Sequence, residues 1–118
     1  MPYRALCAAL FLCLSVTTGG AAERGTASWY GGGEILNHRT ACGQVFSPWG
    51  LTAAHRTLRC GTRVKVINLK NNRTIYLTIS DRGPHKSTGR IIDVTRQAAI
   101  KLGFEKAGTA KVLVVPLR

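Results

Sequence analysis

Acidic residues are scarce in this sequence. Five Asp and Glu stand against 17 Lys and Arg in 118 residues, which gives a formal net charge of +12. Such a balance favours polyanionic partners, although charge that is spread out and only aids solubility fits equally well. The basic residues are not interleaved with aromatic ones as a nucleic-acid platform requires, so no nucleic-acid partner is expected. With so few carboxylates, each is a candidate for acid–base chemistry.

Long apolar runs are also scarce, and the main one lies at the N-terminus. Residues 5–16 are almost wholly apolar, with Arg4 before them and the small residues 19–22 after them. This order is typical of a secretory signal peptide. The run is too short to span a bilayer well, so no stable membrane span is expected. We predict a leader over residues 1–22 and a single exported domain over residues 23–118.

Cysteine is limited to four residues. Cys7 and Cys13 lie in the leader, and the large Leu12 argues against lipid attachment at Cys13. An even pair in a small exported domain, Cys42 and Cys60, predicts a disulfide. Its loop is worth about 3 kcal/mol in the chain-entropy model. Two thiols with scattered histidines lack metal-ligand spacing, so neither a metal site nor a cofactor is expected.

Beyond the leader, the pattern is mainly β. Alternation and β-branched content predict strands over residues 26–30, 62–69, 74–80 and 111–117, and residues 91–94 form a short apolar segment. The last strand is nearly continuous in Val and Leu, which predicts burial on both faces. A short helical turn is expected over residues 51–58 with Thr52 as its cap, and a helix over residues 95–102 between Thr95 and Gly103. Several short strands with one late helix favour a small closed barrel.

Asp81 is the best candidate for an acid–base group. It follows a β-patterned stretch in the run Ile79-Ser80-Asp81-Arg82-Gly83-Pro84. The alternative is structural, because an Asp in such a turn accepts hydrogen bonds from its own backbone. Arg82 could hold a substrate carboxylate or orient Asp81, and a plain salt bridge to Asp93 is the alternative.

Other polar and aromatic residues allow a binding role. His55 stands alone on its predicted turn, where a histidine is more often packed than catalytic. Tyr30 and Trp49 lie beside Gly or Pro and could stack on sugar rings. Trp29 follows strand alternation and is equally suited to the core.

Several blocks occur in an order that resembles the RlpA (rare lipoprotein A) family. They are Ala27-Ser28-Trp29-Tyr30-Gly31, Arg39-Thr40-Ala41-Cys42-Gly43-Gln44-Val45-Phe46, Leu51-Thr52-Ala53-Ala54-His55, Gly61-Thr62-Arg63-Val64-Lys65-Val66, and Asp81-Arg82-Gly83-Pro84 with Arg90-Ile91-Ile92-Asp93-Val94.

The resemblance implies a fold and a function. The fold is a small six-stranded double-psi β-barrel with one or two short helices, as in expansin-like proteins. The activity is that of a lytic transglycosylase, which cleaves peptidoglycan glycan strands lacking stem peptides and leaves 1,6-anhydro-muramyl ends. Such a protein acts in the bacterial periplasm or cell envelope, and we expect a monomer.

The resemblance also implies site residues. Asp81, His55 and Asp93 are the implied catalytic residues, and the implied substrate-binding residues are Tyr30, Gln44, Trp49 and Arg82. Relatives often carry Glu at the position of Gln44 and Asp at that of Ser47. These two side chains can hydrogen-bond sugar hydroxyls but cannot donate a catalytic proton. The alternative function is therefore a non-catalytic, expansin-like module that binds wall glycan.

Overall fold

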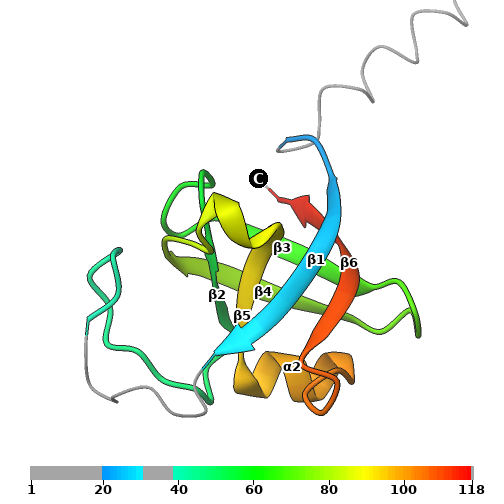
Figure 1. Cartoon of the computed structure of the whole chain (residues 1–118). Helices are drawn as coiled ribbons and strands as arrows, with labels where there is room; N and C mark the ends of the chain where they lie inside the picture. Colours follow the sequence, from blue (N-terminus) through cyan, green and yellow to red (C-terminus); the bar gives the residue numbers. More distant parts are fainter. Residues whose placement is uncertain (1–19, 31–38, 118) are drawn as a thin grey trace, which may run out of the picture.

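The computed structural model describes residues 20–30 and 39–117, so most of the leader predicted over residues 1–22 lies outside the described residues. The chain folds in the order β1 (Glu23–Tyr30), β2 (Thr52–His55), β3 (Arg63–Asn68), β4 (Thr74–Asp81), η1 (Lys86–Thr88), β5 (Arg90–Thr95), α2 (Arg96–Leu102) and β6 (Thr109–Pro116) (Figure 1). Within the described ranges, no helix is long and apolar enough to cross a membrane.

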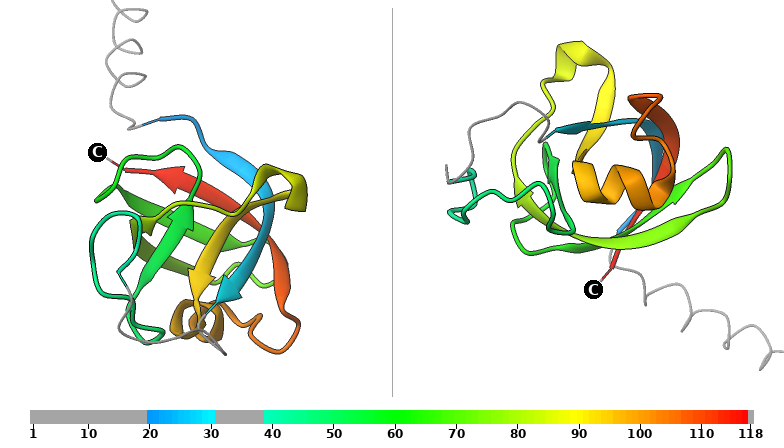
Figure 2. Two further views of the ribbon diagram at one scale, coloured as in Figure 1. Left: turned by 60° about the vertical axis from the view of Figure 1, so that its left-hand side comes forward. Right: turned by 90° about the horizontal axis from the view of Figure 1, so that it is seen from below.

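The strands close into a barrel in the order β1-β5-β2-β4-β3-β6. The pairs β1–β5 and β2–β4 are parallel, whereas the other four pairings are antiparallel. Helix α2 lies across one open end of this barrel (Figure 2). The expected six-stranded closed barrel is therefore confirmed.

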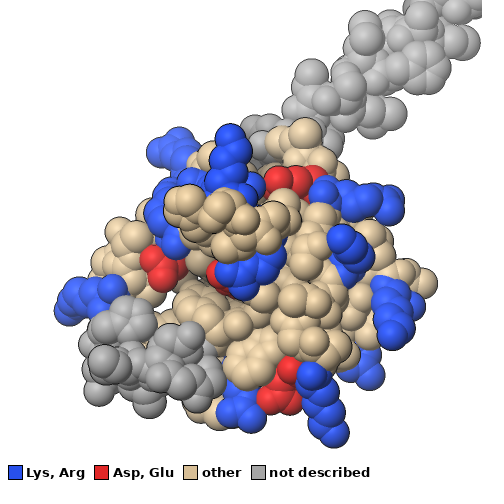
Figure 3. Space-filling view, in the orientation of Figure 1, with Lys and Arg blue, Asp and Glu red and all other residues tan. Residues whose placement is uncertain are grey.

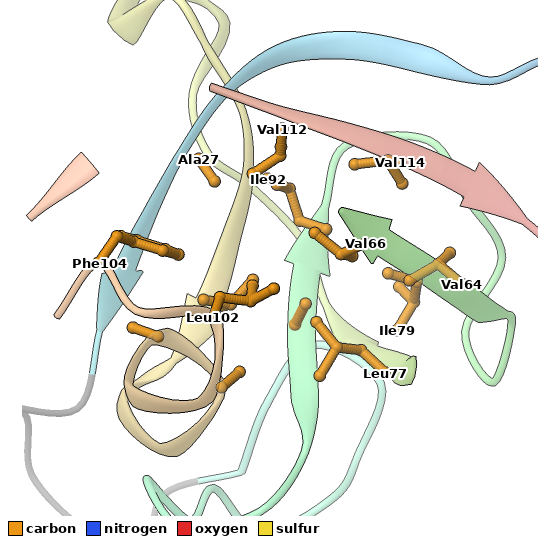
Figure 4. Packing of buried hydrophobic residues seen from close by; sticks show 14 residues of the cluster. Ala27, Val64, Val66, Leu77, Ile79, Ile92, Leu102, Phe104, Val112 and Val114 are labelled. Atoms are coloured by element: carbon orange, nitrogen blue, oxygen red, sulfur yellow. The ribbon is translucent and has the colours of Figure 1, made fainter. Parts of the chain in front are cut away.

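Alternating residues of the strands fill the barrel interior. Val64, Val66, Leu77 and Ile79 are fully buried, as is Leu102 of α2, and they pack with residues of β1, β5 and β6 (Figure 4). A closed barrel has one interior, so each strand buries one face against it.

Strand β6 follows the same rule, against expectation. Val112 and Val114 are buried, whereas Leu113 and Val115 are only half-buried. The predicted burial on both faces is wrong because only the inner face of β6 has a core to pack against.

The helical turn expected over residues 51–58 is also wrong. This segment contains β2, in which Ala53 pairs with Ile79 of β4 and with Val94 of β5. Alanine has the highest helix propensity, but partners on both sides override a local preference of this size. Thr52 begins a strand opposite Thr78 and caps no helix.

The later elements follow their local signals. The β3–β4 hairpin forms as expected. Helix α2 begins after Thr95, whose hydroxyl accepts a hydrogen bond from the Ala98 amide. It ends at Gly103, which adopts φ 85° and so suits a residue without a Cβ.

Both parallel strand pairs contain a register shift. In the β1–β5 pair, Thr26 lies opposite Arg90 and Ala27 opposite Ile92, so Ile91 is an extra residue. A Cβ at Gly25 would lie 2.7 Å from Cγ2 of Ile91. Glycine at position 25 therefore makes room for the bulged isoleucine.

This contact predicts the effect of Gly25→Ala. The added methyl group overpacks the bulge, so the free energy of unfolding should fall by about 1–3 kcal/mol in urea denaturation. Gly50→Ala is the matched control, because the nearest atom to its Cβ would be 3.7 Å away. In an Ile91→Ala background the extra cost of Gly25→Ala should vanish; an unchanged cost there would mean that the clash is not its cause.

Candidate active site

The second register shift determines which way Asp81 points. Ala53 of β2 lies opposite Ile79 of β4, but Ala54 lies opposite Asp81, so Ser80 is an extra residue. Side chains alternate along a strand, and Asp81 would otherwise share the buried face of Ile79. The bulge moves it to the outer face, beside Ala54.

Backbone amides fix the Asp81 carboxylate. Its Oδ1 accepts hydrogen bonds from Ala41 N at 2.8 Å and from Arg82 N at 2.9 Å. One donor belongs to the turn of Asp81 and the other to a loop 40 residues away in sequence. Within residues 20–30 and 39–117, no residue donates to Oδ2, so this oxygen is available to a ligand.

The other described carboxylates each have a basic side chain as a partner. Glu23 lies 3.0 Å from His55 Nε2, and Glu105 lies 2.7 Å from Arg96 Nε. Asp93 lies 3.4 Å from Arg90 Nη1. Among the described residues, Asp81 is the only carboxylate without such a pair.

The predicted disulfide is present. Cys42 and Cys60 are bonded, with their Cα atoms 5.8 Å apart. Within the loop that contains Cys42, Thr40 N donates to Gln44 O and Gly43 N donates to Thr40 O. The disulfide therefore joins a hydrogen-bonded turn to the segment before β3. This turn contains Ala41, whose amide donates to Asp81.

Asp93 and Asp81 lie on either side of the same β2 residue. Ala54 has Asp81 opposite it on β4 and Asp93 opposite it on β5. Adjacent strands are about 4.8 Å apart, so the two Asp Cα atoms are separated by about 10 Å. The Asp93 carboxylate accepts a hydrogen bond from the Ser28 hydroxyl, to which Arg90 also donates.

Arg82 does not form the expected alternative salt bridge with Asp93. Arg90 pairs with Asp93 instead. The guanidinium of Arg82 donates to the carbonyl of His55 at 3.0 Å and more weakly to that of Asp81 at 3.4 Å. Arg82 thus connects the ends of β2 and β4 and is exposed at the same time.

The structure places His55 on the other side of the sheet. It follows the outward-facing Ala54 and pairs with the buried Ile92. Its Nδ1 accepts hydrogen bonds from Thr57 N and Leu58 N, which assigns the ring proton to Nε2 and makes that atom the donor to Glu23. The imidazole lines a separate pocket of about 350 Å³. It is therefore not brought together with Asp81 and Asp93.

An uncharged pocket of about 380 Å³ lies beside Asp81. Its lining comes from the loop after residue 38 and from β2 and β4: Thr40, Gln44, Val45, Phe46, Ser47, Gly50, Thr52, Thr78 and Ser80. Gln44 and Ser47 thus share one pocket. Tyr30 stacks on Phe46 with ring centroids 4.9 Å apart, so it supports the wall. Sequence reasoning missed Ser80 and Thr52 because only the β2–β4 pairing brings them together.

Trp49 is exposed near this pocket. Its side chain is 59% exposed, and the Arg96 guanidinium lies 5.8 Å from its ring centroid. Arg96 also lies 5.7 Å from the ring of Trp29, which packs against the core. The ion pair of Arg96 with Glu105 holds this arrangement. One face of an exposed indole is therefore held in place beside Gly50.

Basic side chains are distributed over the visible face in several groups, and acidic ones are isolated between them (Figure 3). Among the described residues, no group of three or more His, Cys, Asp or Glu gathers as a metal site would require.

The fold and the comparisons together define the class of protein. The closed six-stranded barrel with two parallel pairs is a double-psi β-barrel. A solved mutant expansin of Clavibacter michiganensis in complex with cellohexaose is similar, with TM-score 0.66 and 20% identity over 83% of this chain and 51% of that chain. A Streptomyces papain inhibitor is similar with TM-score 0.65 and 24% identity, over 84% of this chain and 96% of that one. These likenesses show the fold alone.

Sequence comparison gives the family. The family model described as lytic transglycolase matches residues 22–114. The chain is 50% identical over 94 residues to the endolytic peptidoglycan transglycosylase RlpA of Rickettsia bellii, covering 78% of this chain and 41% of that protein. It is 44% identical over 90 residues to the RlpA of Pseudomonas aeruginosa UCBPP-PA14, covering 76% and 26% respectively. The chain belongs to the RlpA family, and it spans less than half the length of these relatives.

The disulfide predicts a local effect on the site. Replacing Cys42 and Cys60 by Ser should lower the free energy of unfolding by about 3 kcal/mol, because the unfolded chain regains loop entropy. The Ala41 amide should also exchange hydrogen faster, since its turn is no longer fixed. Urea denaturation and amide exchange measure the two effects, and the amide of Val66 in β3 is the internal control. Unchanged exchange at Ala41 would contradict a positioning role for the disulfide.

Proposed function

We propose that this chain is an endolytic peptidoglycan transglycosylase that cuts glycan strands lacking stem peptides, with Asp81 as its acid and base. The carrying observation is that Asp81 is an outward-facing carboxylate without a cationic partner among the described residues, beside an uncharged pocket. Two longer relatives that bear this activity in their names support the proposal. Residues 1–22 serve as an export leader, and the domain over residues 23–118 acts as a monomer in the cell envelope.

The reaction needs one carboxyl group at two successive steps. Protonated Asp81 first donates its proton to the glycosidic oxygen while the bond from this oxygen to C1 breaks. The resulting carboxylate then accepts the proton of the sugar's own 6-hydroxyl as that oxygen bonds to C1. The product is a 1,6-anhydro sugar, and no water is consumed. Glycoside hydrolysis instead commonly uses two carboxylates across the bond.

The remaining site residues have supporting roles in this proposal. Asp93, together with Arg90 and Ser28, shapes the outer face beyond Ala54 and is the second candidate carboxylate. His55 acts from the inner face by ordering the end of β2 through its bonds to Thr57 N and Leu58 N. Arg82 holds the same strand end through the His55 carbonyl.

Asp81→Asn tests the assignment. Loss of the acid and base should lower the rate of 1,6-anhydro-muramyl end formation by roughly 10²–10⁴-fold, measured by mass spectrometry of denuded glycan strands. Asp93→Asn is the comparison and should lower the rate less, because its carboxylate is held by Ser28 and Arg90. Thermal unfolding of both variants controls for folding. Anhydro ends formed by Asp81→Asn at the wild-type rate would exclude Asp81 as the catalyst.

A second candidate function is a non-catalytic module that binds wall glycan. Gln44 favours it, because an amide replaces the carboxylate common at this position in relatives. The two functions differ in one product. The binding module would retain denuded strands and release no anhydro ends with the wild-type protein, whereas the enzyme must release them.

Trp49 provides a separate test of glycan binding. A sugar ring stacked on the indole face that Arg96 leaves open should contribute about 1 kcal/mol. Trp49→Ala should therefore weaken binding of denuded strands about fivefold in calorimetric titration. Ile100→Ala is the matched control, since Ile100 is also an exposed apolar residue, at 39% exposure, and lies on α2. Equal affinities of the two variants for denuded strands would show that Trp49 is not part of the binding surface.

A further inference from the structure

The pocket beside Asp81 is uncharged, although the chain is strongly basic. None of the nine described residues that line it is acidic or basic, in a chain with 17 Lys and Arg. Hydroxyls and the Gln44 amide supply its polar groups, and Val45 and Phe46 supply an apolar wall. A neutral ligand that carries both an amide and an apolar group fits this lining better than an ion does.

Ser80 offers a hydroxyl to a ligand in this pocket. It is the extra residue of the β4 bulge, lines the pocket and is only 2% exposed. Its hydroxyl makes no hydrogen bond to any residue within 20–30 and 39–117. A hydroxyl of a pocket-lining residue that makes no such bond can both donate to and accept from a ligand.

A second hydroxyl without a partner faces the same space. Thr52 lies opposite Thr78 in the β2–β4 pair and lines the pocket. Its hydroxyl likewise makes no hydrogen bond within the described part of the chain. By contrast, the hydroxyl of Thr40 already accepts from Gln44 N, and that of Ser47 accepts from Trp49 N. The hydroxyl of Thr78 accepts from Arg63 Nη1. Among the hydroxyls that line the pocket, those of Ser80 and Thr52 are thus the two that make no hydrogen bond to a described residue, and both can donate to and accept from a ligand.

The apolar wall is rigid. Phe46 is 4% exposed and is held from behind by the ring of Tyr30. Val45 beside it is 52% exposed and extends the wall outward. A methyl group entering the pocket would therefore meet a fixed apolar surface without displacing a side chain.

From these features we infer that the pocket binds the acetamido group of an N-acetylhexosamine. Its carbonyl oxygen accepts from the hydroxyls of Ser80 and Thr52, and its methyl group packs against Phe46. The inference rests on the proposed function, because peptidoglycan strands are built from N-acetylated amino sugars. It deepens that function by assigning recognition of the acetamido group to residues next to Asp81. A glucose unit, which has a hydroxyl at this position, would leave the apolar wall unfilled.

Two oligosaccharides that differ only in this group test the inference. They are the β-1,4-linked tetramers of N-acetylglucosamine and of glucose, titrated calorimetrically into the wild-type protein. Wild type should bind the N-acetylated tetramer at least about tenfold more tightly, which corresponds to one or two hydrogen bonds and a buried methyl group. Ser80→Ala and Thr52→Val should each reduce the affinity for this tetramer about fivefold and leave that for the glucose tetramer unchanged.

Controls separate the possible failures. Thr74→Ala removes an exposed hydroxyl on the same strand as Ser80 and should change neither affinity. Thermal unfolding verifies that both pocket variants are folded, and Thr52→Val preserves the side-chain volume. Equal wild-type affinities for the tetramers, or a preference that survives both substitutions, would overturn the inference. If the inference fails in this way but the protein still releases anhydro ends from denuded strands, the proposed function is retained. If no anhydro ends are released, both the inference and the proposed function are excluded.

Discussion

The register shift between β2 and β4 is the constraint on which the candidate site depends. One extra residue, Ser80, separates the pairing of Ala53 with Ile79 from that of Ala54 with Asp81. Without it, the carboxylate would face the apolar interior, where an unpaired charge is very costly. Ser80, the extra residue, also lines the pocket beside Asp81. A single irregularity in strand pairing thus turns the carboxylate outward, next to a residue that lines this pocket.

The loop from residue 39 to 50 completes what the bulge begins. Its turn supplies the Ala41 amide to Asp81, and the Cys42–Cys60 disulfide fixes that turn to the segment before β3. The other end of the loop is held by α2 and its N-cap residue: Gln97 N donates to Pro48 O, and the Thr95 hydroxyl donates to Gly50 O. The loop is therefore anchored near both ends, which preorganises the pocket between them.

Local signals were sufficient for much of the fold but not for the site. Helix α2 and the β3–β4 hairpin carry their caps and turns in adjacent residues, and the sequence predicted both. Strand β2 has no such signal, because it exists through partners on either side. The strand also determines where His55 points, because successive residues of a strand face opposite sides and His55 therefore lies on the face opposite to Ala54. The place of His55 in the site was implied by the family resemblance and not by its local sequence. The bulge at Ser80 depends on the same long-range pairing, so it could not be predicted from the sequence either.

The scarcity of acidic residues acquires a physical meaning in this structure. Asp93 and Glu105 each pair with an arginine and Glu23 accepts from His55 Nε2, while Asp81 has no basic side-chain partner among the described residues. The adjacent Arg82 is close enough to supply one, yet its guanidinium donates to the carbonyls of His55 and Asp81. Because the chain is so basic, Asp81 lacks a cationic partner through the placement of the neighbouring side chains and not through a shortage of Lys and Arg. With Gln44 leaving the pocket neutral, proton transfer in the proposed reaction falls to Asp81 alone, which suits transglycosylation better than hydrolysis.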